Sequence, residues 1–214
     1  MKPIHRILTP ILSILILPIS IFLPMFRIMI TSGLTAETKN NALSSFGLSE
    51  FMSLKDIYTA FMTEEGSSSN FLQLMWKSLS GEKKQEIIDM LPGLHWGAVF
   101  AVCLVIILVI AIVLAIVSAA TKKPAASLIL SVVGAIVALV MNSSFNTFAE
   151  PFVSGSFNLN TLLGNTNQLL GVLLGGIAKF EYMKLGVAYS VIMLTFVGIA
   201  ILSICACMEQ KNED

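Results

Sequence analysis

Long uncharged runs of apolar residues alternate along the chain with two polar connections. Four runs contain no Asp, Glu, Lys, Arg or His, and they cover residues 7–26, 97–120, 126–141 and 185–207. A bilayer core about 30 Å thick is crossed by roughly 20 helical residues, because each residue rises about 1.5 Å. Backbone groups in hydrocarbon must be satisfied within their own segment, so each run is predicted to be a transmembrane helix.

The predicted helices and the connections between them give the chain seven consecutive segments. The predicted segments are transmembrane helix 1 at 7–30, an extracytoplasmic loop at 31–94, transmembrane helix 2 at 95–120, transmembrane helix 3 at 126–148, a second extracytoplasmic segment at 149–184, transmembrane helix 4 at 185–207 and a tail at 208–214. Pro10, Pro18 and Pro24 each remove a backbone donor, so helix 1 is predicted to be kinked. No good small-x-small cleavage site follows it, which predicts an uncleaved anchor.

Basic residues in the short connections predict how the helices are oriented. Lys2 and Arg6 precede helix 1, and Lys122 and Lys123 lie in the short turn between helices 2 and 3. Short loops rich in Lys and Arg stay on the cytoplasmic side. We therefore expect an integral protein of the plasma membrane with both termini in the cytoplasm.

Helical spacing continues in the first outer loop. Ser53 and Asp56 match the pattern that caps a helix start, and apolar residues then recur at helical intervals. A second apolar stripe covers 71–79, and a third short helix is predicted at 82–91. The predicted fold class is therefore all-α: a bundle of four transmembrane helices with a small extracytoplasmic helical cap.

The second outer segment contains an uncharged stretch at 162–178. Its small and polar residues recur at helical spacing on one face: Gly164, Gln168, Gly171 and Gly175. The opposite face is apolar, as in a helix that lies in the membrane interface. A re-entrant hairpin and a short fifth span fit the same pattern, so all three structures remain open.

Stripes of small residues on helices 2 and 3 indicate close helix packing. They are Ala111, Ala115 and Ala119 on helix 2, and Ser127, Ser131, Gly134, Ala135 and Ala138 on helix 3. Small residues let helix backbones approach each other where lipid supplies no hydrophobic driving force. We expect an intramolecular hairpin of helices 2 and 3, with a self-association face as the alternative.

The composition narrows the classes of function. The chain has 13 Lys+Arg and 13 Asp+Glu, and its charged residues amount to only 12%, so no basic excess exists to bind nucleic acid. The histidines, His5 and His95, are expected on opposite sides of the membrane and cannot share a metal. No catalytic, metal-binding or cofactor-binding motif occurs. We expect no enzyme, no metal and no cofactor.

The layout resembles that of four-span families such as the claudins and tetraspanins. Shared features are cytoplasmic ends, a large outer loop and a tight inner turn. Those families carry cysteines in an outer loop, whereas Cys103, Cys205 and Cys207 all lie in apolar runs here. No functional residue is carried over from the resemblance.

These observations predict an accessory or scaffold subunit that acts by lateral helix packing and by contacts of its outer cap. Its expected partners are membrane lipids and another membrane protein or a second copy. A pore- or transport-forming subunit is the first alternative, because a proline-rich helix and a glycine-rich segment are typical of transport sites. A lipid-handling protein that uses the apolar face of 162–178 is the second.

Overall fold

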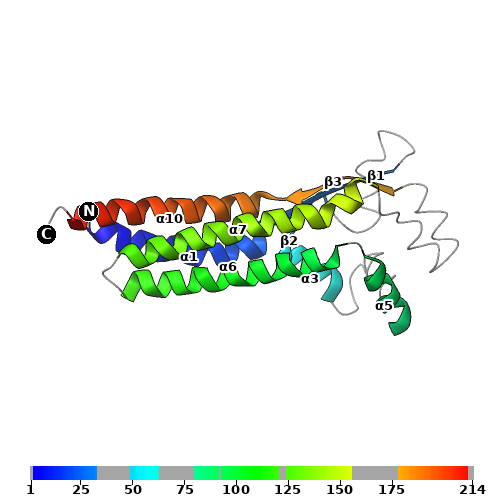
Figure 1. Ribbon diagram of the computed structural model, residues 1–214, viewed down its shortest axis with the longest axis horizontal. Helices are drawn as coiled ribbons and strands as arrows, with labels where there is room; N and C mark the ends of the chain where they lie inside the picture. The colour runs from blue at the N-terminus through cyan, green and yellow to red at the C-terminus, as the bar shows by residue number, and fades with distance from the viewer. Residues whose placement is uncertain are drawn as a thin grey trace. The chain divides into compact units, whose positions relative to one another are not determined.

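The chain folds into two compact units (Figure 1). The computed structural model describes residues 2–32, 49–62, 80–91, 93–120, 124–155 and 178–211. The helical unit consists of Met1–Leu23, Ala98–Ser144 and Val187–Asp214, and the sheet unit consists of Pro24–Gly97 and Phe145–Gly186.

Four helices build the helical unit. They are α1 (Lys2–Phe22), α6 (Leu94–Ala120), α7 (Pro124–Val153) and α10 (Val187–Lys211). The first residues of α6, up to Gly97, and the last residues of α7, from Phe145, belong to the sheet unit. By length and composition, α6, α7 and α10 can cross a membrane, whereas α1 has a shorter apolar stretch, Ile7–Phe22. The prediction of long apolar helices that could cross a membrane is confirmed for these three helices.

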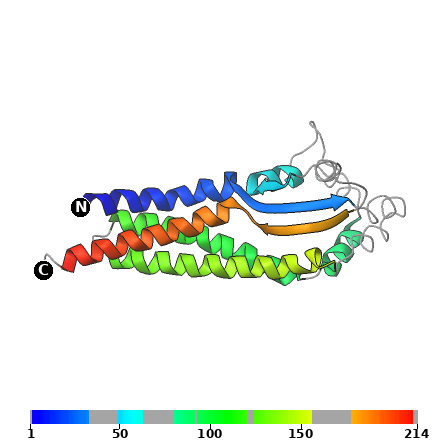
Figure 2. The ribbon, with the colours of Figure 1, turned by 90° about the horizontal axis from the view of Figure 1, so that it is seen from above.

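Helices α1 and α10 lie side by side, and the start of α1 and the end of α10 lie at the same end of the unit (Figure 2). Each helix has a fully buried face, formed by Thr9, Ser13, Ile16 and Ser20 on α1 and by Ala188, Ile192, Phe196, Ile199 and Ser203 on α10. The Ser13 and Ser20 hydroxyls donate to the carbonyls of Thr9 and Ile16, at 2.8 Å and 2.7 Å. These bonds lie within α1, so its serines are satisfied without a partner helix.

Helix 1 is shorter than the predicted 7–30. The helix α1 runs without interruption through Pro10 and Pro18 and ends at Phe22, and Pro24–Ser32 forms the strand β1. Pro24 cannot donate a helical hydrogen bond, and it disfavours the helical conformation of the residue before it. The β-branched residues that follow, Ile28, Ile30 and Thr31, are better suited to a strand.

The sheet unit contains an antiparallel three-stranded sheet in the order β2-β1-β3. Strand β1 pairs with β2 (Phe51–Ser53) on one side and with β3 (Ala178–Leu185) on the other. Figure 2 shows β1 and β3 running next to each other along their length. The predicted fold class is therefore confirmed only in part: the described chain is mostly helical, but this sheet shows that it is not all-α, and the segment 149–184 contains a strand that its sequence pattern did not predict.

The two faces of the sheet differ in character. Met52, Phe26 and Leu185 face one another across the three strands, and Met52 and Phe26 are buried. The end of α7 covers this apolar face with a series of phenylalanine rings. Phe26 and Phe145 have centroids 5.4 Å apart, Phe148 and Phe152 are 5.2 Å apart, and Phe152 and Phe180 are 5.6 Å apart.

A backbone hydrogen bond in the sheet unit joins the start of β1, which follows α1, to the end of β3, which precedes α10. The N–H of Gly186, between β3 and α10, donates to the carbonyl of Met25 at 2.8 Å. A Cβ at Gly186 would lie 2.5 Å from the carbonyl oxygen of Pro24. A side chain has no room there, so glycine is required for this close approach of two backbones.

Two short helices of the predicted cap are present. Helix α3 (Leu54–Met62) starts with the predicted box: the Asp56 N–H donates to Ser53 Oγ at 3.1 Å, and the Ser53 N–H donates to Asp56 Oδ2 at 2.9 Å. Helix α5 (Gly81–Met90) matches the helix predicted at 82–91. The predicted stripe at 71–79 lies outside the described residues.

A close contact in the helical unit joins α7 to α10. A Cβ built on Gly134 would lie 2.5 Å from a ring carbon of Phe196, whose side chain is fully buried. Gly134 therefore provides the space that the phenylalanine ring occupies.

We predict that Gly134→Ala lowers the free energy of unfolding by about 1–3 kcal/mol, because the added methyl group overpacks a filled interior. Gly198→Ala is the matched control, because a Cβ at Gly198 meets no atom within 4 Å. Alanine also favours a helix over glycine, so the control should be neutral or slightly stabilising. Thermal unfolding of both variants in mild detergent measures the effect. Equal melting temperatures for the two variants would contradict the prediction.

Candidate functional site

The small residues predicted for helix packing lie mostly inside the helical unit. Those buried are Ala111, Ala115, Ser127, Ser131, Gly134 and Ala138, while Ala135 is partly buried and Ala119 is exposed. Gly134 contacts α10, whereas the expected hairpin partner of its stripe was helix 2. Most of these residues are thus occupied by contacts within the chain and are not available to a partner.

The second predicted site lies outside the described residues. Gly164, Gln168, Gly171 and Gly175 all belong to the stretch 156–177, which the structure does not describe. The end of the predicted helix 162–178 coincides with the start of β3 at Ala178.

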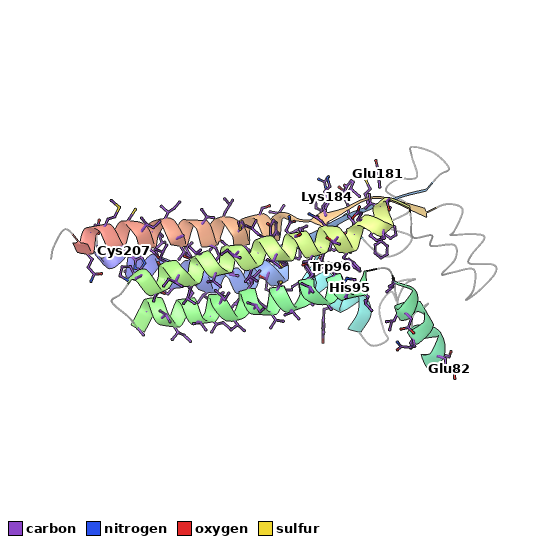
Figure 3. All side chains as sticks on the ribbon, in the orientation of Figure 1. Glu82, His95, Trp96, Glu181, Lys184 and Cys207 are labelled. Atoms are coloured by element: carbon purple, nitrogen blue, oxygen red, sulfur yellow. The ribbon has the colours of Figure 1, made fainter. Side chains whose placement is uncertain are left out.

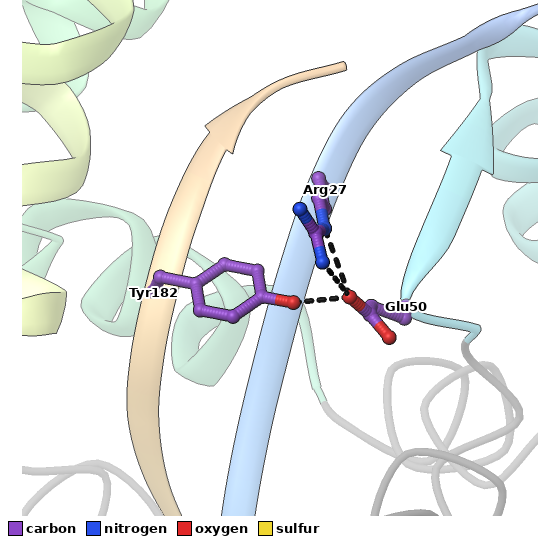
Figure 4. A network of polar contacts seen from close by, with 3 residues as sticks. All are labelled: Arg27, Glu50 and Tyr182. Atoms are coloured by element: carbon purple, nitrogen blue, oxygen red, sulfur yellow. Dashed lines mark hydrogen bonds and ion pairs between the residues drawn. The ribbon is translucent and has the colours of Figure 1, made fainter. Parts of the chain in front are cut away.

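A polar network joins the three strands on the face of the sheet opposite the phenylalanine rings (Figure 4). Arg27, on the central strand, donates from Nε to Glu50 Oε1 at 2.8 Å, and its Nη2 lies 2.7 Å from the same oxygen. The Tyr182 hydroxyl, on β3, also donates to Glu50 Oε1. One carboxylate oxygen therefore links β1 and β3 to the residue that precedes β2.

Aromatic rings flank the guanidinium group of this network. The Cζ atom of Arg27 lies 5.1 Å from the ring centroid of Phe51 and 5.0 Å from that of Tyr182. Distances below about 6 Å allow a cation–π attraction, which holds a guanidinium in a fixed orientation. The arginine is held from three directions, yet its side chain remains 49% exposed.

Strand register extends this face beyond the network. Phe51 and Lys184 are the cross-strand partners of Arg27 on its two sides, so Phe51, Arg27 and Lys184 form one row across the sheet. Phe51 is 46% exposed, and Lys184 is also exposed. Figure 3 shows Lys184 and Glu181 projecting from the same side of β3. We call Phe51, Arg27 and Lys184 the exposed row.

The network shifts the ionisation of its members. The hydrogen bond from Tyr182, followed by the one from Arg27, lowers the pKa of the Glu50 carboxyl. Partial burial, followed by the hydrogen bond to Glu50, raises the pKa of the Tyr182 phenol. At neutral pH the carboxylate is therefore charged and accepts hydrogen bonds from both neighbours.

Within the described residues, no group of three or more His, Cys, Asp or Glu side chains is close enough to hold a metal ion. Nε2 of His5, expected in a basic segment before helix 1, lies 3.3 Å from Ser203 Oγ inside the helical unit. The ring of His95 lies beside that of Trp96, tilted by 45° with centroids 5.1 Å apart (Figure 3). The exposed row offers an arginine, an aromatic ring and a lysine. Such side chains can contact another molecule by hydrogen bonds, charge and apolar packing.

The sequence pattern did not reveal this site. Arg27 was assigned to a transmembrane helix, and Glu50 and Tyr182 to outer segments. The β-branched residues Ile28, Ile30 and Thr31, which directly follow Arg27, are the signal that could have indicated a strand instead of a helix.

No known protein family, curated protein or solved structure matches the chain.

We predict that Glu50→Gln destabilises the sheet unit at neutral pH and that this difference disappears in acid. The folded-state pKa of Glu50 is lowered, so its contribution to stability is complete above its unfolded-state pKa and is lost as the pH falls through the folded value. Thermal unfolding between pH 7 and pH 3 should show the melting curves of the wild-type protein and the variant converging.

Tyr182→Phe removes the largest cause of the shift, so the acid-induced loss should begin at a higher pH than in the wild type. Tyr58→Phe is the control, because Tyr58 is 67% exposed on α3. A constant difference between the wild-type protein and Glu50→Gln across the pH range would disprove the role of the charged carboxylate.

Proposed function

We propose that this chain is a non-enzymatic, four-span membrane protein that acts as an accessory or scaffold subunit. Its exposed row binds another membrane protein. The observation that carries the proposal is the row itself, in which an oriented arginine lies between an exposed phenylalanine and a lysine. Arginine and aromatic residues dominate the energy of protein interfaces when they are held rigidly.

The geometry of the network supports binding. Arginine loses side-chain entropy when it binds a partner, and that cost is smaller when the side chain is already held in place. Glu50 and Tyr182 hold Arg27 before any partner arrives. We therefore assign the partner contact to the sheet and not to the small-residue stripes, which are mostly buried.

The fourth span of this proposal is α1. Its apolar stretch of 16 residues is short for a bilayer. It lies along α10, which is long enough to cross, and the two helices bury facing surfaces. A helix paired in this way is expected to lie in the same membrane layer. The proposed location is the plasma membrane, with both termini in the cytoplasm and the sheet outside.

Epitope tags at the two termini test this topology. Four spans predict that both tags resist an external protease in intact cells and are cleaved once the cells are permeabilised. A tag inserted after Gly155, which the proposal assigns to the outside, is the positive control. Accessibility of one terminal tag in intact cells would show that α1 does not cross.

A photo-reactive amino acid in place of Lys184 tests the partner contact. In native membranes it should form an adduct of one defined mass, which identifies the partner. The same probe in place of Leu194, which is 70% exposed on α10, should react with lipid instead. The same adduct at both positions, or none at Lys184, would refute the proposal.

Phe51→Ala should then weaken the affinity for the purified partner about tenfold, as expected for an aromatic hot spot. Tyr58→Ala removes another exposed aromatic side chain of the sheet unit from outside the row, and it should leave the affinity unchanged. Equal affinities for the two variants would exclude the exposed row as the binding surface.

A pore- or transport-forming subunit is the second candidate. The observation in its favour is that each of the four helices contributes a fully or almost fully buried hydroxyl group to the helical unit: Ser13, Ser118, Ser131 and Ser203. Ion flux through liposomes that contain the purified chain would support this function. Impermeable liposomes would exclude the pore-forming function and would be consistent with the scaffold role.

A further inference from the structure

Two positively charged side chains of the exposed row are direct cross-strand neighbours. Arg27 on β1 pairs with Lys184 on β3 in the register of the sheet, so both side chains project from the same face. Opposed residues of antiparallel strands have Cβ atoms about 5 Å apart, and like charges placed in this way destabilise a sheet. A negative group beside them offsets the repulsion.

Glu50 compensates only one of these two charges. Its Oε1 atom accepts a hydrogen bond from Arg27 Nε at 2.8 Å and lies 2.7 Å from Nη2 of the same side chain. Among the residues that the structure describes, the Lys184 side chain has no ion pair or hydrogen bond. Glu181, an exposed carboxylate three residues earlier on β3, already has a contact with another residue. The exposed row therefore carries one uncompensated positive charge.

The guanidinium group of Arg27 has a second edge that Glu50 does not use. A guanidinium carries five N–H donors in a planar fork, and it binds carboxylates through two neighbouring donors at a time. Glu50 occupies the edge formed by Nε and Nη2, which leaves the edge formed by Nη1 and the second N–H of Nη2. Figure 4 shows the third nitrogen of Arg27 directed away from the Glu50 carboxylate.

Two aromatic rings hold this second edge in place. The ring centroids of Phe51 and Tyr182 lie 5.1 Å and 5.0 Å from Cζ of Arg27. Two such contacts restrict the orientation of the guanidinium group. The Arg27 side chain is nevertheless 49% exposed, so an acceptor from another molecule can reach it.

We infer that the partner of the exposed row contributes an acidic side chain, whose carboxylate accepts hydrogen bonds from the second edge of Arg27 and pairs with Lys184. This inference rests on the proposed function, in which the row binds another membrane protein, and it names the chemistry of that contact. One carboxylate supplies the single negative charge that the row lacks, and its two oxygens match the donors of both side chains. Phe51, which is 46% exposed, packs against apolar atoms beside the carboxylate.

Charge decides which partner surface fits the row. A basic surface repels Arg27 and Lys184. An apolar surface that covered Lys184 would bury its ammonium group without a counter-charge, which is costly. An acidic side chain avoids both penalties.

A water-soluble carbodiimide tests the contact, because it joins an amine and a carboxylate only where the two groups already meet. In native membranes it should form an amide between Lys184 Nζ and one Asp or Glu of the partner, which mass spectrometry of the cross-linked peptides identifies. Lys184→Arg is the control, because it keeps the charge but has no amine, so this cross-link should disappear. Coupling of Lys184 to Glu50 or Glu181 of its own chain, or to the carboxylate of phosphatidylserine, would overturn the inference.

The photo-reactive probe at position 184 separates this inference from the proposed function. A photo-adduct with one protein, together with no amide in the carbodiimide experiment, would support the proposed function and refute the acidic contact. The absence of a protein adduct in both experiments would refute the proposed function and the inference together.

Charge variants give a second measurement with the purified partner. Lys184→Arg should retain most of the affinity, whereas Lys184→Glu should weaken it about tenfold or more, because repulsion replaces attraction. Lys55→Glu is the matched control, because it makes the same change of net charge at an exposed lysine of α3 outside the row, and it should leave the affinity almost unchanged. Equal losses for Lys184→Glu and Lys55→Glu would indicate only a long-range charge effect and would overturn the inference.

Discussion

The missing backbone donor of Pro24 is the constraint on which the sheet unit depends. It ends α1 and starts the central strand, which pairs with both neighbours. The same strand supplies Phe26 to the buried face and Arg27 to the exposed face. Had the helix continued through Arg27, a charged residue would follow the apolar helix, and the sheet would have no central strand. Gly186 completes the arrangement, because only glycine allows β3 to end against the Pro24 carbonyl.

The sequence predicted the long helices well because they depend on local composition. Uncharged runs of about twenty residues have few alternatives to a helix, and the capping box of Ser53 and Asp56 is complete within four residues. The strands were missed for the opposite reason. Most residues of β1 are apolar and do not alternate with polar ones, and the pairing of β3 is irregular opposite Met29 and Ile30. Strand pairing also joins segments about 150 residues apart, which no local pattern encodes.

The site illustrates the same limit. Small residues at helical spacing predicted close packing, but the pattern did not identify the partner helix, which at Gly134 is α10. Arg27, Glu50 and Tyr182 come from three separate parts of the chain, and none of them belongs to a motif. The polar network that they form exists only because β1 pairs with both β2 and β3. The sequence could therefore predict where long apolar helices occur, but not which polar groups meet outside them.

The pairing of α1 with α10 has a consequence for biosynthesis. Helix α1 is translated before α6 and α7, whereas α10 follows both of them. If α1 crosses the membrane as proposed, it waits in the lipid or beside the translocon during that interval. Its internal serine bonds make this tolerable, because Ser13 and Ser20 need no second helix to satisfy their hydroxyls. A nascent chain halted before α10 would leave one side of α1 unmatched, a defect that membrane quality-control proteases could recognise.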